Sequence, residues 1–245
     1  MAPSSLKAVF FDVDDTLYST TAFAAGARRR AMEAMTALGG LRVTADDLLA
    51  ELKEVIAEFG PNYDAHYDRL LRRFSEEDLG GHSRSVLVAA GVAAYEDTKV
   101  REFTAFPGVL EGLRALRERT PLVLGVITEG LEVKQSEKIL RLGVYPFLDR
   151  RAIFISDVIG ISKPNPKLWQ RACAVTGVDP REALYAGDNP VNDIVPAKSV
   201  GMRTVRMRSP GGRHAAAESP LPPDHEAAGF PDLMGILRNL YGLPV

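Results

Sequence analysis

Apolar residues are distributed in two different ways along this chain, and the change falls near residue 103. After it, short apolar runs at residues 122–127, 152–155 and 183–186 are separated by stretches in which apolar residues recur at helical spacing. A similar short run stands near the start, at residues 8–11. Runs of this length are typical of strands buried on both faces, and their alternation with helices predicts a doubly wound, Rossmann-like parallel sheet of the α/β class.

Residues 18–103 show no clear strand pattern, and their apolar residues recur at helical spacing instead. Thr44 followed by Asp47 resembles a capping box, the pattern that begins many helices. The sequence therefore predicts an all-helical domain at residues 18–103, inserted into a core that residues 1–17 and 104–245 form together.

Three further segments carry local expectations. Apolar spacing predicts two helices at residues 83–90 and 92–103, and another at about residues 191–200. Residues 209–229 are rich in Pro, Gly and Ala, which predicts a surface loop or a partly mobile segment.

The composition is that of an ordinary globular protein and argues against several classes of function. The formal net charge of −2 predicts no basic surface, so nucleic-acid binding is not expected. Cys173 is the single cysteine, which excludes an intrachain disulfide and suits a reducing cytoplasm. The four histidines show no ligand spacing, no signal-peptide pattern precedes the first strand, and no apolar run has the length of a membrane span. The sequence makes no prediction about oligomeric state.

Two carboxylates, Asp12 and Asp14, follow directly on the first predicted strand. If the strand geometry continues, both side chains lie on the same side of the chain. Such carboxylates repel each other and need a cation to stay ionised, and oxygen ligands favour Mg²⁺. Aspartate is also common in turns, so this pair alone indicates no more than a polar turn.

Further polar groups stand at the ends of later strands or in the loops that follow them. Thr128, for example, ends the strand predicted at 122–127. Each such group alone has an ordinary explanation as a helix cap, a solvated side chain or a turn residue. Because the carboxyl ends of parallel strands share one edge of the sheet, these groups can converge with Asp12. The set consists of Asp12, Asp14, Thr128, Lys163, Asp188 and Asp193.

In these residues the sequence resembles the haloacid dehalogenase-like (HAD) superfamily, whose core and inserted cap match the predicted organisation. The resemblance implies phosphoryl transfer through an aspartyl-phosphate, with Mg²⁺ as cofactor and a small phosphorylated metabolite as substrate. It implies that Asp12 is the nucleophile and that Asp14 is the general acid and then the general base. It also implies that Thr128 holds a phosphoryl oxygen and that Lys163 neutralises charge. The four motifs correspond to Asp12-Val13-Asp14-Asp15-Thr16, Thr128, Lys163, and residues 187–193.

The same resemblance implies a metal site and a supporting set. Asp12, Asp188 and the backbone carbonyl of Asp14 would bind Mg²⁺, and Asp193 would support the metal or Lys163. Many relatives have Asn or Asp directly after the second-motif Thr or Ser, whereas this chain continues from Thr128 with Glu129. The supporting residues are Thr16, Glu129, Gly130 and Asp193.

The motif spacing places the inserted domain. Asp12 and Thr128 are 116 residues apart, whereas Thr128 and Lys163 are 35 apart. The shorter gap holds only a helix, a strand and a loop, so the insertion lies in the longer one. In the superfamily such an insertion is a type-one cap, which excludes water and favours small substrates.

Part of the predicted cap, residues 59–73 and 95–99, is similar to a HAD subgroup whose members are described as phosphoglycolate or glyceraldehyde-3-phosphate phosphatases. We expect at least one of Asn62, His66 and Lys99 to contact the part of the substrate that is not phosphate. Asn62 and His66 follow a Gly-Pro break, where a helix N-terminus with free N–H groups would suit an anion. The alternative is that this helix face is ordinary solvated cap surface.

Other functions of the same core are weighed against phosphatase activity. A 2-haloacid dehalogenase would release a halide, which needs no proton, so the acid at Asp14 favours a phosphatase. A phosphomutase lacks positive support. A binding protein that had lost activity would be expected to lack Asp12, Asp14, Lys163 or Asp188, and a receiver domain would lack the large insertion.

Overall fold

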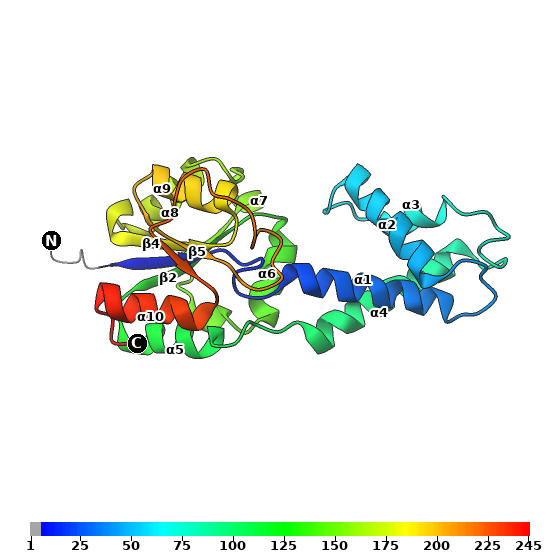
Figure 1. The fold of residues 1–245 in the computed structure, drawn as a ribbon, viewed down its shortest axis with the longest axis horizontal. Coiled ribbons are helices and arrows are strands. Elements are labelled where there is room, and N and C mark those ends of the chain that lie inside the picture. Colours follow the sequence, from blue (N-terminus) through cyan, green and yellow to red (C-terminus); the bar gives the residue numbers. More distant parts are fainter. Residues whose placement is uncertain (1–5) are drawn as a thin grey trace. The chain divides into compact units, whose positions relative to one another are not determined.

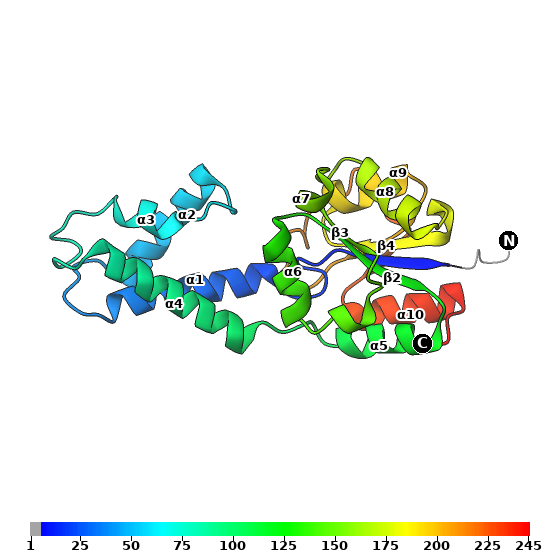
Figure 2. The ribbon, with the colours of Figure 1, turned by 180° about the vertical axis from the view of Figure 1, so that it is seen from behind.

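The computed structural model describes residues 6–245, and the chain divides into two compact units (Figures 1 and 2). The core unit comprises the chain up to Thr21 together with Thr104–Val245, and the helical unit comprises Ala22–Phe103. Among the described residues, no helix is both long enough and apolar enough to span a membrane.

The core unit contains a six-stranded sheet in which every pairing is parallel, as the alternating pattern predicts. The strand order is β3-β2-β1-β4-β5-β6, so the chain builds outward from β1 in both directions. The strand order reverses between β1 and β4, which is a topological switch point, where open α/β sheets bind ligands. The strands are β1 (Ala8–Phe11), β2 (Val123–Thr128), β3 (Ile153–Ile155), β4 (Ala183–Gly187), β5 (Arg203–Met207) and β6 (His225–Ala227).

Helices cover both faces of this sheet, with α8 and α9 on one side and α5 and α10 on the other (Figures 1 and 2). The alternation along β1 explains how one strand is buried on both faces. Phe10 belongs to the cluster that contains Trp169 of α8, whereas Phe11 packs against Phe230 of α10 at a ring distance of 5.8 Å. The core helices are α5 (Val109–Arg119), α6 (Glu132–Arg141), α7 (Ser156–Ile159), α8 (Lys167–Thr176), α9 (Val195–Ser199) and α10 (Phe230–Tyr241).

Two local predictions in the core unit need correction. Residues 209–229 are not loop throughout, because β6 lies within them and extends the sheet beside β5. Asp224 stabilises this edge by accepting hydrogen bonds from the backbone and hydroxyl of Thr204, each at 2.9 Å. The helix predicted at about 191–200 is present, but its first part, Pro190–Ile194, is a π-helix and only α9 (Val195–Ser199) is α-helical.

The helical unit contains no strand among its described residues. Thr44 and Asp47 form the predicted capping box at the start of its second helix, each bonding to the backbone N–H of the other. The two helices predicted at 83–90 and 92–103 are one continuous helix. The helices are α1 (Thr20–Thr36), α2 (Ala45–Phe59), α3 (His66–Leu71) and α4 (Arg84–Glu102). They share an apolar cluster that includes Met35, Leu48, Leu52, Leu70 and Leu87.

Candidate active site

The central strands deliver three of the predicted residues to one edge of the sheet. Asp12 follows β1 and donates its backbone N–H to the carbonyl of Ala186 in β4, at 2.8 Å. Thr128 is the last residue of β2, and Asp188 follows β4. All three side chains are buried. The sheet topology thus brings together groups that are far apart in the sequence.

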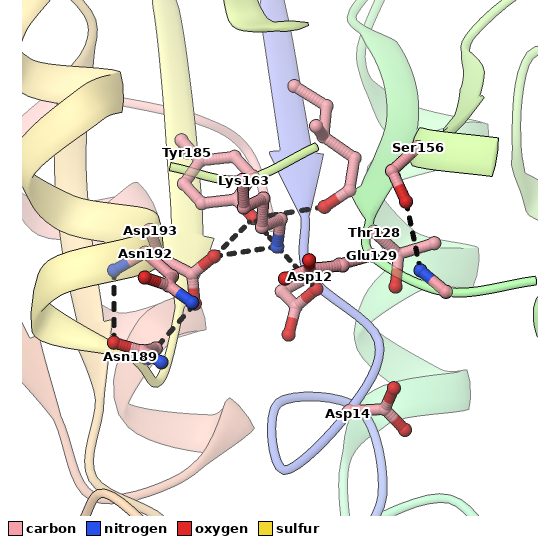
Figure 3. Close-up of polar contacts among 12 residues, drawn as sticks. Asp12, Asp14, Thr128, Glu129, Ser156, Lys163, Tyr185, Asn189, Asn192 and Asp193 are labelled. Carbon is pink, nitrogen blue, oxygen red and sulfur yellow. Dashed lines mark hydrogen bonds and ion pairs between the residues drawn. The ribbon is translucent and has the colours of Figure 1, made fainter. Parts of the chain in front are cut away.

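Lys163 lies between Asp12, Asp193 and Tyr185 (Figure 3). Its ammonium donates to Asp12 Oδ1 at 2.7 Å, to Asp193 Oδ1 at 2.6 Å and to the hydroxyl of Tyr185 at 2.8 Å. The ammonium has three N–H groups, and these three acceptors use all of them. The side chains of Lys163, Asp12 and Asp193 are only 4%, 8% and 2% exposed, so the charges compensate one another away from solvent.

Asp193 is fixed by the turn that follows β4. Its second oxygen accepts the backbone N–H of Asn189 at 3.0 Å, while the Asn189 side chain caps the N–H groups of Val191 and Asn192. Gly187 leaves room for this arrangement, because a Cβ there would lie 2.6 Å from Asp193 Oδ2. The glycine of the fourth motif is therefore required by the close approach of a carboxylate.

Three buried carboxylates, Asp12, Asp188 and Asp193, each place an oxygen within 4.8 Å of the others. Asp188 receives no hydrogen bond from the described residues. Burial, reinforced by Asp12 and Asp193, raises the pKa of Asp188 to about 9. Burial also raises the pKa of Asp12 to about 7, although Lys163 opposes this. A hard divalent cation would favour the ionised forms, so this set of oxygen donors fits such an ion.

Asp14 does not join this group, contrary to the expectation that both leading carboxylates lie on the same side. The strand ends at Phe11, and Figure 3 shows the Asp14 carboxylate turned away from Asp12. Its two oxygens lie 2.7 and 2.8 Å from Lys138 Nζ. Burial acts to raise the pKa of Asp14, but Lys138 and the hydroxyls of Thr20 and Tyr18 outweigh it, and the net pKa is lowered.

The second motif is organised by Gln135, a buried residue of α6. Its amide nitrogen donates to the backbone carbonyl of Glu129 at 2.7 Å and to Asp14 Oδ2 at 3.1 Å. Gly130 allows this packing, because a Cβ there would lie 2.5 Å from the Gln135 amide nitrogen. The side chain of Glu129 is exposed, so this departure from the family pattern adds no buried charge. Thr16 Oγ1 is buried with no hydrogen-bond partner in the described part of the chain.

The three candidate residues of the predicted cap all belong to the helical unit. His66 Nε2 lies 2.8 Å from the carbonyl oxygen of Gly60, and Lys99 Nζ donates to Glu96 at 2.7 Å. Asn62 is exposed and makes no hydrogen bond among the described residues. Two of the three thus have partners inside their own unit.

Sequence reasoning did not find Gln135, Lys138 or Tyr185. Gln135 and Lys138 are three residues apart on a predicted helix directly after the second motif, so they share a face, and that spacing could have identified them. Tyr185 lies in the apolar run of β4, and its hydroxyl accepts a hydrogen bond from Lys163, which lies in a distant loop. No local pattern distinguishes it from a core aromatic residue.

Comparison with known proteins identifies the family. A model of the haloacid dehalogenase-like hydrolases matches residues 6–201. The chain is 41% identical over 239 residues to a glyceraldehyde 3-phosphate phosphatase of Methanopyrus kandleri, with 96% of this chain and 98% of that protein covered. It is 44% identical over 200 residues to a protein of the same name from Pyrococcus abyssi, covering 82% and 80%.

A solved structure of a 2-haloacid dehalogenase from Pseudomonas syringae also resembles this chain. It has a TM-score of 0.61 and 26% sequence identity, and the match covers 96% of this chain and 99% of that one. The residues that the family model matches include Asp12, Thr128, Lys163 and Asp188. The chain therefore belongs to the haloacid dehalogenase-like hydrolase family.

Proposed function

We propose that this protein hydrolyses a small phosphomonoester through a covalent phosphoryl intermediate on Asp12. The observation that carries the proposal is the buried ion pair of Asp12 and Lys163 at the switch point of the sheet, beside further carboxylates that fit a divalent cation. A carboxylate is a competent nucleophile once it is ionised, and both Lys163 and a bound divalent cation would favour the ionised form of Asp12. Lys163 counters the repulsion between that carboxylate and a phosphate dianion.

In the first step, an oxygen of Asp12 forms a bond to phosphorus as the bond from phosphorus to the ester oxygen breaks. Asp14, whose pKa Lys138 lowers, first takes up a proton from solvent and then gives it to the leaving oxygen. In the second step, Asp14 takes a proton from water, whose oxygen bonds to phosphorus, and inorganic phosphate and free Asp12 are formed. Thr128, at the end of β2, holds a phosphoryl oxygen by its hydroxyl. Positioning and charge neutralisation are most of what phosphoryl transfer requires.

We assign the divalent cation as Mg²⁺, because carboxylate and carbonyl oxygens are the ligands it prefers. Asp12, Asp188 and the backbone carbonyl of Asp14 would hold it, and it would supply positive charge to the phosphoryl oxygens. Asp193 is assigned to Lys163 instead, since its two oxygens already accept hydrogen bonds from Lys163 and from the Asn189 backbone.

The proposed substrate is a small phosphorylated metabolite, with glyceraldehyde 3-phosphate as the first compound to assay. This choice rests on the relatives of that name, which align over nearly the whole chain in the first case. The cytoplasm, where such metabolites occur, also suits a protein whose single cysteine, Cys173, is buried and free.

Turnover by the purified protein tests the proposal. We expect it to release phosphate from p-nitrophenyl phosphate and from glyceraldehyde 3-phosphate with Mg²⁺, to lose activity in EDTA, and to regain it when Mg²⁺ is restored. Activity that EDTA does not reduce would refute the metal assignment. Release of halide from a 2-haloacid, without phosphatase activity, would establish the dehalogenase alternative instead.

A further inference from the structure

The carboxylate of Asp14 has a cation of its own, separate from the one that serves Asp12. Lys138 of α6 approaches both of its oxygens, at 2.7 and 2.8 Å, and lies over the ring of Tyr18 at 6.0 Å. The side chains of Lys138 and Asp14 are 22% and 29% exposed, so the pair is partly withdrawn from solvent.

Lys163 cannot also serve Asp14, because all three of its N–H groups already have acceptors. Lys163 donates to Asp12, Asp193 and Tyr185, which are as many acceptors as an ammonium group can serve. Asp14 could pair with Lys163 only by displacing one of these acceptors. The other donors around Asp14 are neutral: the hydroxyls of Tyr18 and Thr20 and the amide of Gln135.

Gln135 connects this pair to the second motif. It bonds to Asp14 and to the carbonyl of Glu129, and Thr128 Oγ1 lies 3.4 Å from its amide oxygen. Gln135 is buried and lies one helical turn before Lys138. One face of α6 therefore holds Asp14 at a fixed place relative to the threonine proposed to bind phosphate.

We propose that Lys138 is a positioning residue that acts through Asp14. It supplies the dedicated counter-charge that keeps the Asp14 carboxylate ordered next to the second motif and prevents it from pairing with Lys163, the cation that bonds to Asp12. The inference rests on the proposed acid–base role of Asp14. Without Lys138, a carboxylate with only neutral donors would be drawn to Lys163 or to the metal site, and the steps that need Asp14 would slow.

The test compares two esters whose leaving groups differ in their need for a proton. p-Nitrophenolate leaves with little protonation, whereas the alkoxide of glyceraldehyde 3-phosphate needs a proton. We expect Lys138→Met to lower kcat for glyceraldehyde 3-phosphate by about tenfold and kcat for p-nitrophenyl phosphate by less than about threefold, with KM little changed. Lys138→Arg keeps the charge and should recover most of the loss. Lys134→Met, an exposed lysine of the same helix, is the matched control and should not alter the ratio of the two rates.

The same substitution in an Asp14→Asn background separates positioning from general damage to the fold. If Lys138 acts through Asp14, Lys138→Met should change neither rate further in that background, because the group it positions is gone. Equal losses in both backgrounds, equal losses on both esters, or a gain in glyceraldehyde 3-phosphate turnover would each overturn the proposal. If the parent protein cleaves neither ester, the proposed function fails; if Asp14→Asn loses the alkyl ester selectively while Lys138→Met does not, only the present inference fails.

Discussion

A cation in each of the two units, Lys163 in the core unit and Arg73 in the helical unit, is paired with more than one carboxylate, and the two clusters differ mainly in burial. In the core unit, Lys163 bonds to Asp12 and Asp193, and none of the three side chains is more than 8% exposed. In the helical unit, Arg73 lies 2.5 Å from oxygens of both Glu51 and Glu58, with side chains that are 25%, 29% and 54% exposed.

The difference in burial separates a chemical role from an ordinary surface role. Water screens the charges around Arg73, so their attraction contributes little and their loss is easily tolerated. The charges around Lys163 have no such screening, and removing one leaves the others uncompensated in the interior. A protein with such a buried cluster of charges is destabilised when any one of them is mutated. Clusters of this kind are therefore candidates for a functional site.

The largest effect should come from removing the nucleophile. Asp12→Asn replaces a charged oxygen with an amide that cannot form the phosphoryl intermediate. We expect a loss of activity of about 10⁴-fold or more, the scale on which removal of a covalent nucleophile acts. Phosphate release from p-nitrophenyl phosphate measures it. Asp46→Asn, an exposed carboxylate paired with Arg29 in the helical unit, is the control and should retain parental activity.

The comparison between the clusters is tested directly by removing each cation. Lys163→Met leaves Asp12 and Asp193 without their shared partner, so we expect a loss of about 3 kcal/mol in the free energy of unfolding. The rate should also fall by about 10²- to 10³-fold, because a charge that stabilises the transition state is lost. Chemical denaturation in EDTA measures the first effect without contribution from bound metal.

Arg73→Met is the matched substitution in the helical unit, and it should leave both the free energy of unfolding and the turnover nearly unchanged. If the two substitutions destabilised the protein equally, burial would not be the property that distinguishes the clusters.

A smaller effect is expected from the hydroxyl of Tyr185, which accepts a hydrogen bond from Lys163 at 2.8 Å. The same hydroxyl lies 3.0 Å from both Asp193 Oδ1 and the carbonyl oxygen of Ile127. Tyr185→Phe should cost about 1–2 kcal/mol of stability and lower kcat several-fold, because one N–H of a buried ammonium loses its acceptor. Tyr63→Phe removes a hydroxyl that accepts from Arg69 in the helical unit, and it should change neither. Unchanged kcat in Tyr185→Phe would show that Lys163 does not need this third acceptor.

The sequence predicts the α/β class and the positions of the central strands along the chain, because a buried parallel strand is a short apolar run in the sequence. It also locates Asp12, Thr128 and Asp188, since each stands at the end of such a run. β6 has no such run: its three residues, His225–Ala227, form a strand only because β5 offers a free edge.

The contacts within the site are less accessible to sequence reasoning. Lys138 meets Asp14 across 124 positions of the chain, and only the folded core brings them together. The chain leaves the strand geometry after Phe11, and Asp14 is turned away from Asp12 as a result. The hydrophobic pattern of the sequence does not show where a strand changes direction, so this orientation could not be predicted. The helical unit shows the opposite case, because the capping box at Thr44 depends only on neighbours in the sequence and was fully predictable from them.

The smallest effects should arise in the helical unit, at the residues expected to contact the substrate outside its phosphate. Asn62 is the strongest of the three candidates, because His66 closes its own turn onto Gly60 and Lys99 pairs with Glu96. Asn62→Ala should raise KM for glyceraldehyde 3-phosphate by about three- to tenfold, the equivalent of one hydrogen bond, and leave KM for p-nitrophenyl phosphate unchanged. His66→Ala should lower the stability of the helical unit without altering the ranking of substrates. If alanine at 62, 66 and 99 all leave that ranking unchanged, these residues are ordinary cap surface and substrate choice lies with other side chains.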